Sequence, residues 1–383
     1  YKDITYTKVR PSYEIKETVK EITANIPERN IDEKIKKIYE YITENIQYSS
    51  VSFRQSAFTP QSARDVLVTR IGDCKDLATL CIAMLSEIGV SADYVLVNTK
   101  DQGLNKNILP SIAFNHAIVS VNSNKGPIYL DLTAQNYPFA ALPEPDRGAF
   151  SLIIKNGNSN SIYLDSENII QSEIIRDTKC KLTSDNKINL FSNNTRKGAA
   201  VGDFKANFRY LGSSEKHKTM SESLAQEYPN MVLNKFETEN IDSSLDIVNY
   251  TLDMTIPDYL TEAGDFKMLK IPWSDKLFPL KALSYESRTY PFLYWPYADK
   301  MSETFEIEIP QEYIPVNEKG TGSFSYNGGS YNIKYEFKNN KIVAERNIIF
   351  RNREIDVKDY QDFKSFYNNV LKSDDQVILL KKK

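Results

Sequence analysis

The spacing of apolar residues predicts helices in the first part of the chain. Between residues 31 and 46 the isoleucines and one tyrosine lie on one helical face, and Lys and Glu fill the other. The same spacing predicts a helix over 14–24, a short one over 60–67 that Pro60 begins, and one from Cys74 that Gly89 ends.

Further along, the pattern changes to alternation, which predicts strands over 92–97, 114–121, 128–132 and 150–154. The second and third of these strands are expected to form a hairpin, because a polar segment ending in glycine, 122–126, joins them. If Ser123 and Asn124 make the turn, opposing positions sum to 247, and His116 faces Asp131 across the hairpin. Any odd sum keeps these two side chains on one face of the sheet.

From about residue 165 the chain consists mainly of short alternating segments separated by turn residues, which predicts a β-sandwich. The predicted strands cover 179–182, 188–191, 202–210, 245–256, 303–309, 322–326, 331–337, 341–350 and 376–380. Two helices interrupt them, around 214–227 and 358–371. Trp273 and the segment 290–297 are aromatic, and they fit either a ligand or saccharide platform or the packed interior of the sandwich.

A chain of 383 residues is long enough for two or three domains. We predict an α+β protein in which residues 1–160 form the mixed domain and residues 161–383 form a β-rich region. The boundary follows from turn and linker residues at 143–148 and 156–161. If the β-rich region holds two subdomains, they divide it into about 161–275 and 276–383.

The composition argues against several partners and cofactors. Lys and Arg number 48 and Asp and Glu 51, a net charge of −3, so nothing points to nucleic acid. No apolar run approaches the roughly 20 residues that span a bilayer. Three cysteines cannot form a full disulfide framework, and with two histidines a Cys/His zinc site is not expected. No metal or other cofactor is predicted.

Cys74 is the first candidate for chemistry. It follows Asp73, a favourable N-cap residue, so it falls in the first turn of a helix, where the dipole and unpaired backbone N–H groups favour a thiolate. Cys74 is therefore a candidate nucleophile; the alternative is a buried, small apolar side chain, which is the usual place of a free cysteine. Cys81 lies on the apolar stripe of the same helix and is expected in the core.

His116 and Asp131 complete a possible set of nucleophile, base and orienting carboxylate. A histidine on one strand and an aspartate on the next can move a proton for Cys74 and fix the imidazole tautomer. Taken singly, His116 could be a packed strand residue and Asp131 a cap for the turn that follows it. The other histidine, His217, lies in a charged segment and is expected to be structural or inert.

Three blocks of the sequence resemble a known family: Gly72-Asp73-Cys74-Lys75-Asp76, Phe114-Asn115-His116-Ala117 and Tyr129-Leu130-Asp131-Leu132-Thr133. In this order they resemble the bacterial transglutaminase-like superfamily, in the branch with an Arg-x-Gly-Asp-Cys-Lys-Asp motif and β-rich flanking domains. The resemblance covers roughly residues 31–135. It implies a papain-like α+β core with Cys74, His116 and Asp131 as the catalytic triad and no cofactor.

The same resemblance implies features outside the core. The family usually has a β domain upstream, and this chain is expected to begin too late to contain it whole. The β-rich region after the core resembles the C-terminal flanking domain of the same branch. The family's usual architecture also implies an extracytoplasmic location, periplasmic or at the cell surface.

Oxyanion stabilisation needs donors beyond the triad. The backbone N–H of Cys74, at a helix start, is one natural donor. Gln61 and Tyr48 are candidate side-chain donors, chosen on hydrogen-bonding ability. Arg70 and Lys75 could help to keep Cys74 ionised, although we expect Lys75 to be a surface cation.

The resulting hypothesis is a cysteine-dependent acyl-transfer enzyme that acts on a peptide or protein through a thioester on Cys74. Hydrolysis by a peptidase or amidase is favoured over cross-linking, since nothing in the sequence marks a site for an amine acceptor. The rival hypothesis is a non-catalytic binding or scaffold protein, in which the papain-like core is a spacer and the β-rich region binds a protein or glycan partner.

Overall fold

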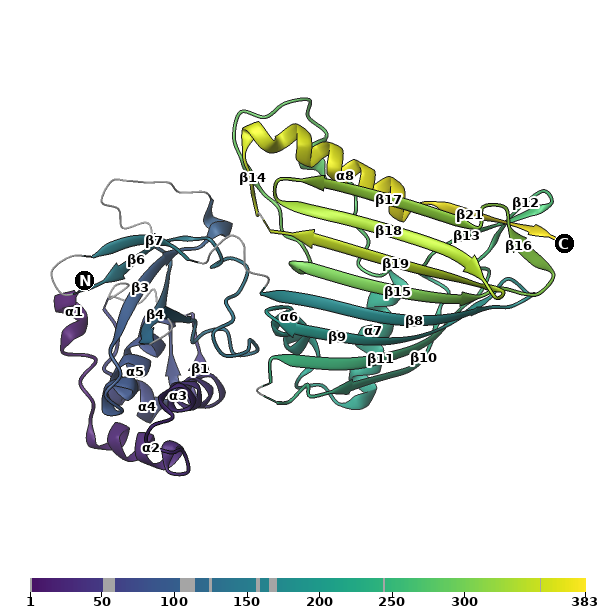
Figure 1. The fold of residues 1–383 in the computed structure, drawn as a ribbon. Helices are drawn as coiled ribbons and strands as arrows, with labels where there is room; N and C mark the ends of the chain where they lie inside the picture. Colours follow the sequence, from purple (N-terminus) through teal and green to yellow (C-terminus); the bar gives the residue numbers. More distant parts are fainter. Residues whose placement is uncertain are drawn as a thin grey trace. The chain divides into compact units, whose positions relative to one another are not determined.

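The structure is a computed structural model, and it describes residues 2–50, 59–103, 114–123, 126–155, 159–164, 171–243, 245–351 and 353–383. It forms two compact units, Tyr1–Glu167 and Asn168–Lys383, which are described separately as units 1 and 2 (Figure 1). Both units contain helices and strands, which confirms the predicted α+β class. No helix in these ranges is long and apolar enough to cross a membrane.

The helices of unit 1 lie close to where the apolar spacing predicts them. They are α1 (Lys2–Tyr6), α2 (Tyr13–Thr23), α3 (Ile31–Asn45), α4 (Ala63–Thr69) and α5 (Cys74–Glu87), with a short 3-10 helix, η1 (Lys100–Gln102). The start of α4 differs from the prediction. The Ser62 hydroxyl accepts a hydrogen bond from the Asp65 N–H at 3.1 Å, so Ser62 is the N-cap and the helix does not begin at Pro60.

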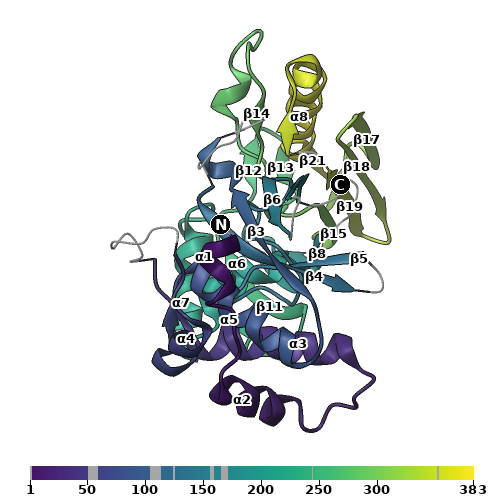
Figure 2. The ribbon, with the colours of Figure 1, turned by 90° about the vertical axis from the view of Figure 1, so that its left-hand side faces the viewer.

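The strands of unit 1 form two sheets. They are β1 (Gln47–Tyr48), β2 (Ile71–Gly72), β3 (Ala92–Asn98), β4 (His116–Ser123), β5 (Gly126–Leu130), β6 (Phe150–Ile154) and β7 (Asn160–Tyr163). The strands β1 and β2 pair in parallel, and the other five form an antiparallel sheet in the order β5-β4-β3-β6-β7. Helix α5 packs on β3 and β4, and Figures 1 and 2 show α2 to α5 gathered on one side of this sheet.

The two faces of the five-stranded sheet have different covers. Val119 and Val121 of β4 join the apolar cluster that the helices form. On the other face, Ile118 packs in a separate cluster with Leu142 and Ala149, which come from the segment between β5 and β6. By alternation His116 shares the face of Ile118, so this segment lies over the face from which His116 projects.

The predicted register of the hairpin is wrong: the residue numbers of opposing positions add up to two more than predicted. Val119 pairs with Leu130 and Ser123 with Gly126, so opposing positions sum to 249. Ser123, one of the two predicted turn residues, therefore belongs to the ladder, and the other, Asn124, lies outside the described residues. His116 and Asp131 are therefore not direct partners across the ladder. The sum is still odd, which keeps both side chains on one face.

The strands of unit 2 are mostly longer than predicted. They are β8 (Ser172–Leu182), β9 (Ile188–Gly198), β10 (Val232–Glu239), β11 (Ile247–Ile256), β12 (Thr261–Ala263), β13 (Phe266–Lys270), β14 (Phe292–Leu293), β15 (Lys300–Glu308), β16 (Tyr313–Pro315), β17 (Lys319–Tyr326), β18 (Gly329–Lys338), β19 (Lys341–Phe350), β20 (Glu354–Ile355) and β21 (Val377–Lys382). The helices are α6 (Ala200–Phe208), α7 (Ser213–Ala225) and α8 (Tyr360–Asp374), with the 3-10 helices η2 (Lys281–Leu283) and η3 (Val357–Asp359).

One eight-stranded sheet runs through unit 2, in the order β10-β11-β9-β8-β15-β19-β18-β17. Its central pair, β8 and β15, is parallel, and the other pairs are antiparallel. Because β8 and β15 come from different halves of the region, the division into 161–275 and 276–383 is wrong: both halves build the same sheet. A smaller sheet has the order β12-β13-β21-β16.

Residues 202–210, predicted as a strand, belong mostly to helix α6. Phe204 and Phe208 are four positions apart, a spacing that puts two side chains on one face of either a strand or a helix. Both are buried, with ring centroids 4.8 Å apart, where α6 packs on β8 and β9. The two predicted helices of this region are found as α7 and α8.

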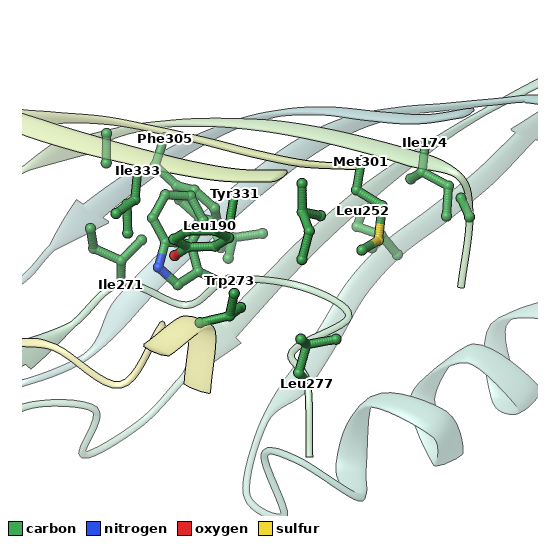
Figure 3. Packing of buried hydrophobic residues seen from close by; sticks show 14 of the residues in the cluster. Ile174, Leu190, Leu252, Ile271, Trp273, Leu277, Met301, Phe305, Tyr331 and Ile333 are labelled. Carbon is green, nitrogen blue, oxygen red and sulfur yellow. The ribbon is translucent and has the colours of Figure 1, made fainter. Parts of the chain in front are cut away.

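One face of the large sheet is buried, as the alternation along β8 and β19 shows. The residues packed against that face come from helices, from the smaller sheet and from the segment after β13. In the predicted β-sandwich a second sheet alone would cover this face. Figure 3 shows Trp273, from that segment, against Phe305 of the large sheet, with ring centroids 5.2 Å apart. Trp273 and Tyr294 are thus core residues, whereas Tyr290 and Tyr297 are exposed.

A buried charge cluster lies in the same core. The Arg346 guanidinium donates to Asp374 Oδ2 and to Glu303 Oε2, each at 2.7 Å, and lies 5.0 Å from the ring centroid of Trp273. Tyr331 donates its hydroxyl to the other oxygen of Asp374 at 2.7 Å. Arg346 therefore forms ion pairs with two buried carboxylates, and its loss would leave both without this cation.

We predict that Arg346→Met destabilises unit 2 by about 3–5 kcal/mol, because it removes the partner of two buried carboxylates. Urea denaturation of the full chain, followed by tryptophan fluorescence, measures this, since Trp273 contacts Arg346. The matched control is Lys334→Met, which breaks the exposed pair with Glu345 at 3.0 Å and should cost less than about 1 kcal/mol. Equal losses in the two variants would contradict the prediction.

Candidate active site

Cys74 is the first residue of α5, and its side chain is partly exposed. Asp73 is the N-cap: its Oδ1 accepts the N–H groups of Lys75 and Asp76 at 3.1 Å each. In return, Asp76 Oδ2 accepts the Asp73 N–H at 3.1 Å, which completes a capping box. The predicted placement of Cys74 in a capped first turn is confirmed.

Close packing holds the chain just before Cys74. A Cβ at Gly72 would lie 2.8 Å from Asp76 Cβ and 3.3 Å from Val66 Cγ1, so only glycine fits there without a shift. On its other side, Gly72 pairs with Tyr48 of β1, and its carbonyl accepts the Ser49 N–H at 2.9 Å. The backbone just before Cys74 is thus held in place by contacts with both α5 and β1.

The basic residues near Cys74 have other partners. Lys75 is buried, and its ammonium group pairs with the Asp73 carboxylate, so the expectation of a surface cation is wrong. Arg70 is exposed and ends α4 with a left-handed φ of 58°. Its guanidinium lies 5.4 Å from the ring centroid of Tyr41.

The structure brings His116 between Cys74 and Asp131. Nε2 of His116, the first residue of β4, lies 3.3 Å from Oδ1 of Asp131, which directly follows β5. The Cys74 side chain also interacts with the His116 ring and raises the pKa of His116. Because Nε2 faces Asp131, Nδ1 is the ring nitrogen left for Cys74. The order is that of a nucleophile, a base and an orienting carboxylate.

Asp131 is anchored by the turn it begins. Its Oδ1 accepts both the backbone N–H and the hydroxyl of Thr133, each at 2.8 Å. The reading of Asp131 as a turn cap is therefore also correct. One carboxylate closes the turn and faces the histidine, and the turn fixes its orientation.

The charges of the site reinforce one another. Burial opposes the imidazolium form of His116, but the Asp131 carboxylate and the hydrogen bonds to Asp131 and Cys74 outweigh it, so the pKa of His116 lies well above its usual range. Burial also opposes ionisation of Asp131; the charge and hydrogen bond of His116, with the bonds from Thr133, nevertheless lower the pKa of Asp131. The structure thus favours an imidazolium beside a carboxylate.

Asp146 joins the site and was not singled out from the sequence. Its Oδ2 lies 3.9 Å from His116 Nε2, and its side chain is 3% exposed. Burial, followed by the negative charge of Asp131, raises the pKa of Asp146 to about 8. The only sequence signal was its place in the turn-rich segment Pro143–Gly148, which predicted a domain edge rather than a site.

The proposed oxyanion donors are placed differently. In the hydrogen bonds of the described residues, no acceptor takes the Cys74 N–H, while Asp73 takes those of Lys75 and Asp76. Burial and the negative charge of Cys74 raise the pKa of Tyr48, which keeps its hydroxyl a donor. Gln61 instead donates its side-chain amide to Asp76 Oδ2 and its backbone N–H to Oδ1, each at 2.8 Å, so it supports the helix start.

The remaining thiols and the second histidine lie apart from this constellation. Cys81 is fully buried and Cys180 is 5% exposed, and burial raises the pKa of both thiols. His217 lies in α7 of unit 2, where its Nε2 is 3.0 Å from the Leu233 carbonyl oxygen. These positions agree with the predicted structural roles of Cys81 and His217.

Within the described ranges, His116, Asp131 and Asp146 are the one set of His, Cys, Asp and Glu side chains whose donor atoms all lie within 4.8 Å of one another. Asp131 Oδ1 already accepts two hydrogen bonds from Thr133, and the His116 ring is engaged by Cys74 and Asp131. Because these atoms already have partners that suit proton transfer, we assign no metal to this set.

A cysteine at a capped helix start, next to a histidine that faces an aspartate, is the arrangement of a papain-like cysteine site. Comparison with known families agrees: residues 16–131 match the transglutaminase-like superfamily, so unit 1 carries a transglutaminase-like domain. Residues 267–380 match a domain of unknown function with a solved structure, DUF3858. A search of curated proteins finds no match to the chain.

The chain matches several solved structures, among them the following two. That of a "putative protease" from Parabacteroides distasonis ATCC 8503 aligns with a TM-score of 0.59 and 13% identity, over 98% of this chain and 57% of that one. That of a "putative cysteine protease" from Cytophaga hutchinsonii aligns over 42% of this chain and 56% of that one, with 20% identity and a TM-score of 0.25. The first shows a shared fold, and this chain spans little more than half the length of either relative.

We predict that Gly72→Ala destabilises unit 1 by about 1–3 kcal/mol, because its Cβ would overlap the Asp76 side chain and displace the helix start. Chemical denaturation measures the loss, and Cys74 should be alkylated more slowly. The control is Gly212→Ala, where a new Cβ meets nothing nearer than 3.7 Å. Unchanged stability and reactivity in Gly72→Ala would show that the close approach is not required.

Proposed function

We propose that unit 1 is a cysteine-dependent enzyme that cleaves amides in peptides or proteins through a thioester on Cys74. The observation that supports this most directly is the position of His116: its Nε2 lies 3.3 Å from Asp131 Oδ1, and its ring interacts with the Cys74 side chain. Cys74 is the nucleophile, His116 the acid and base, and Asp131 the residue that orients the ring.

The elevated pKa of His116 sets the order of proton transfers in this proposal. His116 begins protonated beside a Cys74 thiolate. Sγ of Cys74 bonds to the amide carbon, the proton of His116 passes to the nitrogen, and the C–N bond breaks to release an amine. Neutral His116 then takes a proton from water, whose oxygen displaces Sγ and releases a carboxylic acid.

Two donors suit the oxyanion of this reaction. The Cys74 N–H lies at the positive end of α5, where a developing negative charge is stabilised. The Tyr48 hydroxyl is the side-chain donor we propose, because β1 holds Tyr48 opposite Gly72 and its raised pKa keeps it protonated. Gln61 is the weaker candidate, since Asp76 occupies its amide.

We also propose hydrolysis rather than cross-linking, and an extracytoplasmic location. Both rest on the sequence and its resemblance: nothing marks an amine-acceptor site, and the usual architecture of the family that the chain resembles implies an extracytoplasmic location. A mixed-peptide digest with and without an added primary amine separates water from amine as acceptor. Cell fractionation tests the location, and recovery of the native protein only with the cytoplasm would overturn it.

We predict that native Cys74 reacts with iodoacetamide near neutral pH faster than a free thiol does, because the thiolate is paired with His116. Peptide mass mapping reads each cysteine separately, so Cys81 and Cys180 act as internal controls that stay unlabelled in the folded chain. His116→Ala should slow the reaction. If Cys74 labels no faster than glutathione and His116→Ala changes nothing, the enzyme proposal fails.

We predict that Asp131→Asn lowers kcat/KM for amide hydrolysis by about 10⁴-fold, since an amide cannot stabilise the imidazolium or fix its tautomer. Because folded Asp131 has a lowered pKa, its stabilising effect is present above the unfolded pKa and is lost as pH falls through the folded one. The stability of the wild type relative to Asp131→Asn should therefore shrink toward acid pH. A variant with wild-type turnover would exclude the orienting role.

A further inference from the structure

We propose that Asp146 is a positioning residue of this site: it shares one proton with Asp131 and presents a second carboxyl group to His116. The inference rests on the proposed role of His116 as the acid and base of the reaction. It concerns a buried acid that the relay of Cys74, His116 and Asp131 does not itself require.

The backbone around Asp146 is held on both sides. The Asp146 N–H donates to the Pro143 carbonyl at 3.0 Å, and the Ala149 N–H donates to the Asp146 carbonyl at 2.9 Å. The Lys100 N–H of η1 donates to the Pro145 carbonyl at 2.9 Å. These backbone hydrogen bonds fix the position of Asp146, and Oδ2 of its side chain lies 3.9 Å from Nε2 of His116.

The fold explains why this segment reaches the site. His116 and Asp131 share one face of the five-stranded sheet by alternation, and Ala149 belongs to the apolar cluster that covers this face. Asp146, three residues before Ala149, is therefore placed next to the side chains of His116 and Asp131. Among the described residues Asp146 Oδ2, the oxygen that lies 3.9 Å from His116 Nε2, has no hydrogen-bond partner.

Two carboxyl groups in one buried place cannot both ionise without a large cost. Asp131 is the one favoured as a carboxylate, because Thr133 and His116 stabilise its charge. Burial and the charge of Asp131 raise the pKa of Asp146 to about 8, so near neutral pH Asp146 is mainly a neutral acid with an O–H to donate. One oxygen of each carboxyl group lies within 4.8 Å of the other, so a proton on Asp146 can be shared with Asp131 and hold it from a side that Thr133 does not.

The charged groups that face Asp146 come from several elements. Asp131 and His116 are nearest, and Asp101 of η1 adds a further negative charge that raises the pKa of Asp146. The Lys100 ammonium lies near Gly148, two residues along, at 3.5 Å from where a Cβ would sit. In its own segment, Arg147 is paired with Glu144 at 3.2 Å. Burial, together with these carboxyl and imidazole neighbours, thus sets the protonation of Asp146.

The negative charge beside His116 therefore depends on pH. Below about pH 8 the two carboxyl groups together carry one negative charge, on Asp131. Above it, ionised Asp146 adds a second charge 3.9 Å from Nε2, which favours the imidazolium and keeps His116 protonated to a higher pH than Asp131 alone would.

The test is histidine NMR on the full chain, labelled with ¹³C-histidine and titrated from acid to alkaline pH. The chain has two histidines, so His217→Gln assigns both signals. In Asp146→Asn, which keeps a donor but cannot ionise, the midpoint of His116 should fall by about one pH unit, while that of His217 stays. The pH profile of Cys74 alkylation should lose its inflection near 8. A His116 midpoint that does not move overturns the proposal.

A second measurement needs no variant. In the wild type labelled with ¹³C-aspartate, one carboxyl signal should titrate near pH 8, far above the ordinary range of about 3.9. If every aspartate titrates in the ordinary range, the proposal fails even where Asp146→Asn does not fold.

These results separate this proposal from the proposed function. If His116 shifts in Asp146→Asn but the protein neither labels rapidly at Cys74 nor cleaves amides, the enzyme proposal falls and the placement of Asp146 is supported. If the protein is an active hydrolase and His116 does not shift, only the role of Asp146 falls.

Discussion

The carboxylate of Asp76 holds together the start of α5, on which the site depends. One oxygen accepts the Asp73 N–H, the amide of Gln61 binds the same oxygen, and the Gln61 backbone N–H binds the other. The first turn of any helix leaves backbone N–H groups without partners, and the capping box satisfies them with two side chains. Asp73 and Asp76 take these roles, and in the described residues the Cys74 N–H has no acceptor.

Both units bury charges, and both keep them in clusters of opposite sign. In unit 2 the Arg346 guanidinium lies between Glu303 and Asp374. In unit 1 His116 lies near Asp131 and Asp146, but its charge depends on a proton. A guanidinium stays charged at any ordinary pH, so the first cluster is a fixed part of the core, whereas the second responds to pH.

The elements of unit 1 were readable from local pattern, and those of unit 2 less so. Helix α5 carries its own cap and an apolar stripe, so its bounds followed from the residues themselves. Within the range predicted as a strand, 202–210, Phe204 and Phe208 have a spacing that fits a strand as well as helix α6. Its packing on β8 and β9 decided the matter. The parallel pairing of β8 with β15 joins segments more than a hundred residues apart, which no local pattern encodes.

The sequence by itself determined which residues could do chemistry: Cys74 through its capped helix start, and His116 with Asp131 through the parity of a hairpin. Parity survives a register error of two, because side chains alternate with period two, and so the pair was found although its predicted register was wrong. Only the tertiary structure decided what surrounds them. Asp146 reaches His116 through a segment that covers one face of a sheet, and Gln61 turns to Asp76, because such contacts depend on how distant elements pack and not on any spacing along the chain.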